Sequence, residues 1–218
     1  MWPLLRRARW RLTKPLRVAR HAAAGALFGV KEADTEGLVL LEEFGLAAPG
    51  RVQYQPSGDT WLWRALRGLP VTREDVFLDY GSGKGKVVLQ AALRYSFSKV
   101  IGVDISEELT SIARSNVERL RSRFRAAEVE LVVADAAEWP LPDEVTYVYM
   151  YRPFKEALFE TVLERVNESL RRNPRKLTLA YAYPEQEDVV LRNGFTRIRK
   201  SRGPNKIPQY TVGVYVRG

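Results

Sequence analysis

An acidic residue followed by closely spaced glycines has the types and spacing of a ligand-binding turn. Asp79 comes directly after the apolar run 76–78, and the turn Gly81–Gly85 has glycine at alternate positions. Because glycine has no side chain, such a turn lets a ligand approach backbone N–H groups and the amino terminus of the next helix. Asp104 ends the next apolar run about 20 residues later, where a carboxylate is placed to accept hydrogen bonds from both hydroxyls of a ribose.

The spacing of these glycines excludes two common nucleotide-binding motifs. A dinucleotide fingerprint requires G-x-G-x-x-G, whereas the third glycine here comes one residue early. A P-loop requires Ser or Thr after its Gly-Lys pair, but Val87 follows Gly85-Lys86. The pattern Asp-x-Gly-x-Gly-x-Gly instead resembles the first motif of the class I S-adenosylmethionine-dependent methyltransferases. The resemblance implies that S-adenosylmethionine is the cofactor and lies across this turn; a tight turn with no ligand is the alternative.

A narrower resemblance begins before the turn. The runs Tyr54-Gln55-Pro56-Ser57 and Val87-Val88-Leu89-Gln90 resemble the cofactor domain of the non-SET histone lysine methyltransferase (Dot-one-like) family. That family has Tyr-x-x-Thr at the same distance before its motif aspartate. The match implies that Tyr54 and Ser57 hold the methionine end of the cofactor. Alternatively, or in addition, Ser57 caps the helix that follows it.

The same resemblance implies the rest of the cofactor site. Asp135, after the third apolar run, matches the acid that contacts the adenine amino group in many class I members. An ordinary aspartate at a strand end is the alternative for this position. The residues expected at the cofactor are Tyr54, Ser57, Asp79, Gly81, Ser82, Gly83, Gly85, Asp104, Ile105, Asp135, Ala136 and Tyr151.

The segment Tyr151-Arg152-Pro153-Phe154 occupies the position of the catalytic loop, where similar bacterial proteins carry Tyr-Asn-Pro-Phe. We assign Tyr151 and Arg152 as the candidate catalytic residues, but an asparagine-type amine-binding role does not carry over to arginine. Methyl transfer requires the acceptor to be held in line, and requires a base only if the nucleophile is protonated. We therefore expect positioning chemistry on an O or N acceptor. Four tyrosines either shape this pocket and relay a proton or pack against the sheet: Tyr149, Tyr151, Tyr181 and Tyr183.

Basic residues near the expected site bear on the acceptor. Arg152, Lys200, Arg202 and Lys206 fall at one edge of the predicted sheet, and no acid follows Asp188 to neutralise the last three. Because cations around a cleft attract anions, we expect a small-molecule acceptor that carries a carboxylate or phosphate. The alternatives are a protein lysine methyltransferase, a nucleic-acid-binding protein that kept the fold and lost the activity, and an enzyme of another nucleotide such as a reductase.

Composition bounds the remaining possibilities. The chain has 218 residues, 45% of them hydrophobic, which suits one globular domain with an appendage. It contains no cysteine and one histidine, His21, which excludes disulfides, thiolate metal sites and multi-histidine metal sites. We therefore expect no metal. The lack of cysteine fits a reducing compartment, and with the cofactor motif it favours a cytoplasmic enzyme.

The net charge of +9 is concentrated at the two ends of the chain. Residues 1–20 and residues 189–218 each hold seven basic residues and no acid. Such ends attract nucleic acid, anionic lipid or acidic substrates, or are simply solvated. An apolar stripe in residues 1–20 predicts a basic amphipathic helix that packs as a lid or associates weakly with a membrane surface. Residues 22–30 resemble a weak signal peptide but are too short to span a bilayer. The oligomeric state stays open.

Apolar runs alternate with helical patterns along the rest of the chain, which predicts a parallel, doubly wound α/β sheet. The last two strands are joined without a helix, so they should pair antiparallel and close the sheet. The expected architecture is a Rossmann-like seven-stranded methyltransferase domain at residues 51–218, preceded by a basic helical extension at residues 1–50. Strands are expected at 76–78, 99–103, 129–134, 145–151, 177–181, 195–200 and 210–216, and helices at 61–69, 106–125, 155–171 and 185–192.

Overall fold

The computed structural model describes residues 30, 33–201 and 210–218. The predicted amphipathic helix in residues 1–20, most of the signal-like run 22–30, and both Arg202 and Lys206 lie outside the described residues. In the described part of the chain, no helix is long and apolar enough to cross a membrane.

Seven strands form one mixed sheet: β1 (Val76–Tyr80), β2 (Lys99–Asp104), β3 (Glu128–Val133), β4 (Val145–Tyr151), β5 (Leu177–Ala182), β6 (Thr196–Ser201) and β7 (Val212–Arg217). Their order across the sheet is β3-β2-β1-β4-β5-β7-β6. The first five strands are parallel, and β7 runs antiparallel to both β5 and β6. This confirms the predicted Rossmann-like methyltransferase sheet with its closing antiparallel hairpin.

β1 and β2 extend beyond their predicted ends to include the two acids. Asp79 lies within β1 and pairs with Gly102, while Asp104 lies within β2 and pairs with Val133. Both acids stay in the parallel ladder because the strands on either side continue beside them. The two carboxylates therefore leave the sheet at the carboxyl ends of adjacent strands, where ligands of open α/β sheets bind.

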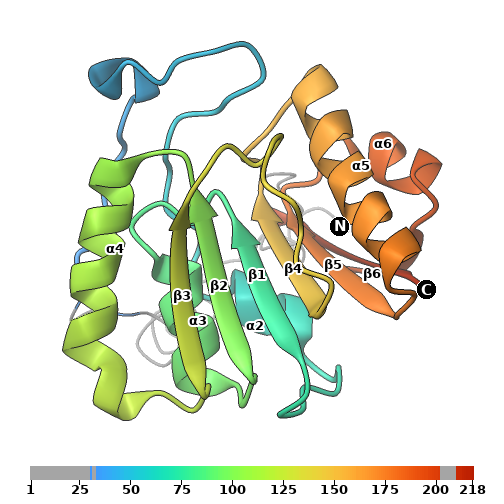
Figure 1. Cartoon of the computed structure of the whole chain (residues 1–218), viewed down its shortest axis with the longest axis horizontal. Coiled ribbons are helices and arrows are strands. Elements are labelled where there is room, and N and C mark those ends of the chain that lie inside the picture. Colours follow the sequence, from blue (N-terminus) through green and yellow to red (C-terminus); the bar gives the residue numbers. More distant parts are fainter. Residues whose placement is uncertain (1–29, 31–32, 202–209) are drawn as a thin grey trace, which may run out of the picture.

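Helices cover both faces of the sheet, which gives the molecule three layers (Figure 1). On one face lie α2 (Trp61–Leu66), α3 (Lys86–Arg94) and α4 (Glu107–Leu120); on the other lie α5 (Glu156–Arg172) and α6 (Glu187–Arg192). Side chains of β1 alternate between the two core layers: Phe77 packs with residues of α2 and α3, and Leu78 with residues of α5. Burial on both faces explains the continuous apolar runs of the central strands.

Several helix ends differ from the sequence prediction: α2 ends at Leu66 rather than residue 69, and α6 begins at Glu187 rather than residue 185. After Leu120 the chain tightens into a 3-10 helix, η2 (Arg121–Arg123), so α4 stops short of residue 125. The residue preceding α2 is Thr60, so Ser57 is not its cap. Ser106 does cap α4, because its hydroxyl accepts a hydrogen bond from a backbone N–H of the first turn.

Residues 33–57, which we call the crossing segment, run over the carboxyl edge of the sheet (Figure 1). The segment includes a 3-10 helix, η1 (Leu41–Phe44). Val39 pairs with Tyr54 in an antiparallel bridge inside the segment, and Arg51 pairs with Phe154 beyond the end of β4. The polypeptide that precedes α2 is thus attached to the edge where β1 to β4 end.

Ion pairs attach the first part of the crossing segment to the glycine turn and to α3. The Lys84 ammonium lies 3.1 Å from an Asp34 carboxylate oxygen. Lys86 is buried, and its ammonium contacts Glu36 at 2.6 Å and Asp59 at 2.9 Å. Because a buried lysine is stable only when its charge is paired, these contacts hold the segment closely against the domain.

Candidate functional site

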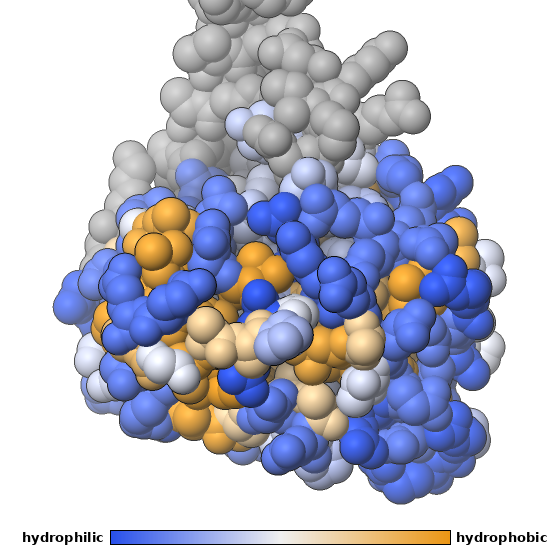
Figure 2. Space-filling model, turned by 90° about the horizontal axis from the view of Figure 1, so that it is seen from above, coloured by the Kyte–Doolittle hydropathy of each residue, from blue (hydrophilic) through white to orange (hydrophobic). Residues whose placement is uncertain are grey.

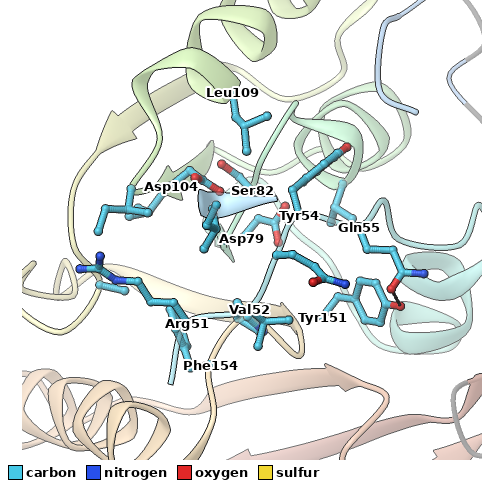
Figure 3. A pocket seen from close by; sticks show the side chains of 18 of the residues that line it. Arg51, Val52, Tyr54, Gln55, Asp79, Ser82, Asp104, Leu109, Tyr151 and Phe154 are labelled. Carbon is cyan, nitrogen blue, oxygen red and sulfur yellow. Dashed lines mark hydrogen bonds between the residues drawn. The ribbon is translucent and has the colours of Figure 1, made fainter. Parts of the chain in front are cut away.

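A pocket lies at the carboxyl edge of the sheet, between the strand ends and the crossing segment. Figure 2 views this edge from above and shows apolar surface in the middle of the face, surrounded by hydrophilic residues. The sheet side of the pocket comes from the ends of β1 to β4 and the loops after them. The other side comes from residues of the crossing segment, including Arg51 and Val52 (Figure 3).

Most of the residues predicted to bind the cofactor line this one pocket. They are Tyr54, Ser57, Asp79, Gly81, Ser82, Asp104, Ile105, Asp135, Ala136 and Tyr151. Gly83 and Gly85 do not line it but form the turn beside it. The structure therefore brings together residues from five separate stretches of the sequence; their roles as cofactor ligands stay predictions.

The glycine turn has a backbone that other residues rarely adopt. Gly81, Gly83 and Gly85 have φ angles of 72°, 51° and 81°, in the left-handed region. A Cβ atom on Gly83 would lie 2.2 Å from the ring of Tyr54, and one on Gly81 would lie 2.7 Å from the Cβ of Pro153. The alternating glycines are thus required both by the turn and by the close packing of the crossing segment and the catalytic loop against it.

Asp104 links the end of β2 to this turn. Its carboxylate accepts hydrogen bonds from the backbone N–H of Gly83 at 2.7 Å and from that of Ser106 at 2.9 Å. Burial raises the pKa of Asp104 above its usual value, and these backbone hydrogen bonds oppose the rise. Each oxygen accepts one N–H and keeps a free lone pair, so the carboxylate can still accept from a ligand hydroxyl.

Asp79 is the unusual group of the pocket. It is 3% exposed, and no donor among the described residues makes a hydrogen bond or ion pair with its carboxylate. Burial, and then the neighbouring Asp104, raise its pKa well above the usual value. The buried hydroxyl of Ser82 also lacks a hydrogen-bond partner in the described chain. Buried polar groups are normally paired, so these two groups indicate a missing polar, and in part cationic, ligand.

Asp135 is held by a residue that sequence reasoning missed. Arg51 of the crossing segment donates from Nη2 to Asp135 at 2.8 Å and from Nη1 to the carbonyl of Leu46 at 3.0 Å. The other Asp135 oxygen accepts the backbone N–H of Ala137 at 3.0 Å. No motif marked Arg51; the only signal is its place in the stretch leading to Tyr54.

The tyrosines divide into two groups. Tyr149 and Tyr181 are fully buried and belong to the two core layers, so they pack against the sheet. Tyr149 also donates to the Ser57 hydroxyl at 3.2 Å. Tyr151 lines the pocket, and its hydroxyl donates to the side-chain oxygen of Gln55 at 3.2 Å (Figure 3). Of these residues, Tyr151 is the one whose hydroxyl is positioned at the pocket.

Arg152 lies outside this pocket, and the prediction that the nearby cations are not neutralised is wrong. Arg152 forms an ion pair with Glu185 at 3.2 Å. Lys200 lies within β6, inside the predicted strand 195–200, and it pairs with Glu187 at the start of α6. The sequence argument considered acids only beyond Asp188, whereas both partners precede it and approach through the fold.

Comparisons with known proteins agree with this geometry. Residues 77–173 match the family model described as a methyltransferase domain. A curated protein-lysine N-methyltransferase from Saccharolobus islandicus (strain REY15A) is 30% identical over 79 residues, which is 36% of this chain and 49% of that protein. The chain therefore spans about half the length of this curated relative.

Solved structures share the fold at low sequence identity. A SAM-dependent methyltransferase from Aquifex aeolicus is 18% identical, with a TM-score of 0.53 over 71% of this chain and 87% of that chain. A putative RNA methyltransferase from Pyrococcus horikoshii is 19% identical, with a TM-score of 0.53 over 75% of this chain and 85% of that chain. At such identity the likeness establishes the fold alone.

The pocket fits S-adenosylmethionine. That molecule carries an ammonium group, a sulfonium and ribose hydroxyls, and the pocket offers the unpartnered carboxylate of Asp79, the free lone pairs of Asp104 and the unpartnered hydroxyl of Ser82. Three left-handed glycines leave the backbone accessible at the same place. Residues 77–173 therefore match a methyltransferase domain, and the sheet that carries them has the Rossmann-like methyltransferase fold.

Proposed function

We propose that the whole chain is an active S-adenosylmethionine-dependent methyltransferase. The observation that carries the proposal is the buried carboxylate of Asp79, which lines the pocket without a partner among the described residues, beside a second buried carboxylate. A buried carboxylate without a partner, next to a second carboxylate, is costly in its charged form unless a cation binds. A cationic cofactor supplies that charge, whereas the pyrophosphate of a nicotinamide cofactor would add negative charge, which argues against the reductase alternative.

In this proposal the acids that line the pocket each hold a different part of the cofactor. Asp79 accepts from the ammonium group, with Tyr54 and Ser57 near the same methionine end, as the Dot-one-like resemblance implies. Asp104 accepts from the ribose hydroxyls, and Asp135 from the adenine amino group. The free lone pairs on the last two carboxylates support these roles.

The cofactor supplies a methyl group on a sulfonium, which leaves without needing a proton. The protein then has to orient an O or N acceptor and exclude water, and orientation alone can supply several kcal/mol of the barrier reduction, roughly 7 or more in favourable cases. Tyr151, held by Gln55 at the pocket wall, is the candidate to orient the acceptor. Burial raises the pKa of Tyr151, so its hydroxyl stays protonated at neutral pH and is not a base. Because its one proton is donated to Gln55, the hydroxyl oxygen can orient the acceptor by accepting a hydrogen bond.

We propose a small molecule with a carboxylate or phosphate as the acceptor. Arg152 follows Tyr151 directly, and Lys155 lies close by with no partner for its ammonium among the described residues. Protein lysine methylation is the second candidate, favoured by the similarity to the Saccharolobus protein and by the Dot-one-like resemblance. Cytoplasmic localisation, association of residues 1–20 with membranes and binding of nucleic acid stay predictions.

Replacement of Asp79 by Asn tests the proposal. Loss of a charge-assisted hydrogen bond costs about 1.5–3 kcal/mol, so D79N should bind S-adenosylmethionine roughly ten- to a hundredfold more weakly by calorimetry. Because the raised pKa of Asp79 shows that its charged form is disfavoured in the fold, the same variant without cofactor should melt at a higher temperature than the wild type.

The control is Asp188→Asn, which makes the same change of charge in an exposed ion pair with Arg192. Surface pairs contribute little, so D188N should leave cofactor affinity unchanged. Equal cofactor affinity in D79N and the wild type would contradict the proposal, as would wild-type binding of NAD but not of S-adenosylmethionine. A panel of small carboxylic acids, phosphate esters and lysine peptides with labelled cofactor then distinguishes the two acceptor classes.

A further inference from the structure

A second cavity lies beside the cofactor pocket, on the acceptor side. It has a volume of about 230 Å³. Its walls are residues of the crossing segment and the two cations Arg152 and Lys155, which follow β4. Four residues line both this cavity and the cofactor pocket: Leu41, Arg51, Val52 and Gln53. The two spaces are therefore neighbours that share one wall.

Arg152 is held in a fixed place at this cavity. Its guanidinium lies over the ring of Tyr183, 4.9 Å from the ring centroid, and its Nη1 pairs with Glu185 at 3.2 Å. In the part of the chain that the structure describes, the polar partners of the guanidinium are Glu185 and the Tyr183 hydroxyl. An arginine held in this way keeps a pair of N–H donors whose spacing matches the two oxygens of a carboxylate or phosphate.

The other charges around the cavity leave one cation without a partner. Lys155 is exposed and its ammonium has no ion-pair partner among the described residues. Arg51 is already paired with Asp135, and Arg152 with Glu185. Glu42 is the one acid that lines the cavity, and it is exposed to solvent. Among the described cations that line the cavity, Lys155 is thus the one without a partner, and Arg152 lines it while held by Glu185.

The backbone that carries these cations is strained. Among the described residues other than glycine, three have a positive φ: Arg152 at 48°, Glu156 at 52° and Tyr183 at 51°. A left-handed residue with a side chain costs about 1–2 kcal/mol, and such strain persists where the surroundings enforce it, often at ligand sites. Arg152 and Tyr183 lie in the loops that follow β4 and β5, and Glu156 is the first residue of α5.

Hydrogen bonds of the Gln186 side chain join the chain after β5 to the chain after β4. The side-chain oxygen of Gln186 accepts the backbone N–H of Glu156 at 2.7 Å, and its side-chain nitrogen donates to the carbonyl of Phe154 at 3.1 Å. The loops after β4 and β5 are therefore one rigid unit. The fold stabilises an unfavourable backbone at Arg152, and the result is a cation in a defined position next to Tyr151.

We infer that this cavity is an oxyanion subsite, in which Arg152 and Lys155 bind a carboxylate or phosphate of the methyl acceptor. Tyr183 and Glu185 are positioning residues that hold Arg152 for this contact. The assignment of the oxyanion to the methyl acceptor rests on the proposed methyltransferase function. The binding of an oxyanion in the cavity is independent of that function.

Inorganic phosphate and acetate are the probes. The full chain, saturated with S-adenosylhomocysteine, is titrated with each anion and followed through the side-chain N–H resonances of its arginines. The Arg152 Nε–H resonance, assigned by its loss in Arg152→Gln, should shift saturably in the wild type. Arg152→Gln and Lys155→Gln should each weaken phosphate binding about tenfold or more, whereas Lys176→Gln, at the opposite edge of the sheet, should not. Cofactor affinity should stay the same in all three variants.

Two results would overturn the inference. One is phosphate affinity that is unchanged in both R152Q and K155Q. The other is phosphate affinity that falls as much in K176Q as in R152Q and K155Q, because that would indicate unspecific attraction to positive charge. The positioning role has its own readout, because Tyr183→Phe keeps the ring under Arg152 and should keep phosphate affinity, whereas Tyr183→Leu should reduce it. Exposed Lys155 provides a test even if a change at Arg152 impairs folding. Failure of the methyltransferase proposal appears separately, as absent cofactor binding in the wild type.

Discussion

The carboxyl edge of the sheet has two halves that are built differently. In the half formed by β1 to β3, the left-handed backbone positions are glycines, and Asp79 is buried without a partner among the described residues. In the half formed by β4 to β6, the left-handed positions are Arg152, Glu156 and Tyr183, and charged side chains pair with one another across loops.

The difference shows how each half obtains its shape. Glycine adopts a left-handed backbone at no steric cost, so the first half can present bare backbone and unpaired polar groups to a ligand. The second half needs contacts such as Arg152–Glu185 and Gln186–Glu156 to hold its loops in place. One half leaves polar groups for a cofactor to satisfy, while the other satisfies most of its charges internally and exposes few donors.

The largest expected effect is in the glycine half, at Asp104. Asp104→Ala removes the acceptor of the Gly83 and Ser106 N–H groups as well as the expected ribose contact. Loss of hydrogen bonds to a charged group costs about 1.5–3 kcal/mol, so cofactor affinity measured by calorimetry should fall at least about tenfold. Asp104→Asn keeps one acceptor oxygen and should lose less. Unchanged affinity in D104A would remove Asp104 from the site and weaken the contrast between the halves.

In the half formed by β4 to β6, the contribution of Glu187 to the free energy of unfolding should depend on pH in the opposite sense to that of Asp79. Burial opposes ionisation of Glu187, but hydrogen bonds from Lys200, Arg197 and Tyr215 prevail and lower its pKa from 4.5 to about 2. A depressed carboxylate pKa stabilises the fold above 4.5 and loses that contribution as the pH falls toward 2. Asp79, with a raised pKa, destabilises the fold when it is charged.

Glu187→Gln should therefore reduce the free energy of unfolding at pH 7 by about 2 kcal/mol, and the difference from the wild type should shrink between pH 4.5 and 2. Urea denaturation across this pH range measures both quantities. Asp188→Asn, the exposed neighbour, serves as the control and should change stability by less than about 1 kcal/mol. A difference between E187Q and the wild type that is the same at pH 7 and at pH 2 would show that the ion pairs are not its cause.

The smallest effect should come from exchanging glycine and non-glycine residues between the halves. Glu156→Gly relieves a left-handed φ of 52° at an exposed side chain without partners among the described residues. The relief of about 1–2 kcal/mol is offset by the entropy of glycine, so stability should change by less than about 1 kcal/mol. The matched change, Gly85→Ala, puts a Cβ 3.0 Å from that of Ala113 at a φ of 81° and should destabilise by about 1–2 kcal/mol or more. Thermal melts of both variants measure these changes. A larger loss of stability in E156G than in G85A would contradict the prediction.

The same contrast explains how much the sequence could predict. The alternating glycines, Asp79 and Asp104 are neighbours in the sequence or end adjacent strands, so local pattern and sheet topology were enough to bring them together. The continuous apolar runs likewise predicted the seven strands within a few residues of their ends.

Pairings between distant loops could not be predicted in this way. Arg51 meets Asp135 across 84 residues, and Arg152 meets Glu185 across 33, through loops whose paths depend on side-chain contacts rather than on periodicity. The predicted strand 195–200 is displaced by one residue from β6 because the apolar pattern of this strand is weak. In the structure β6 is an edge strand whose side chains are half-buried or exposed, so burial left little hydrophobic signal in its sequence.

The crossing segment has a consequence for the rate of ligand exchange. It is joined to the domain by Arg51–Asp135, Lys84–Asp34 and Lys86–Glu36, and it forms one wall of the cofactor pocket. A ligand enclosed between this segment and the sheet exchanges only as fast as those ion pairs open. If the ion pairs must open before a ligand can bind or leave, this step slows association and dissociation by the same factor. The residence time of the ligand then lengthens while its equilibrium affinity stays the same. Salt screens the exposed parts of these pairs and should therefore shorten the residence time.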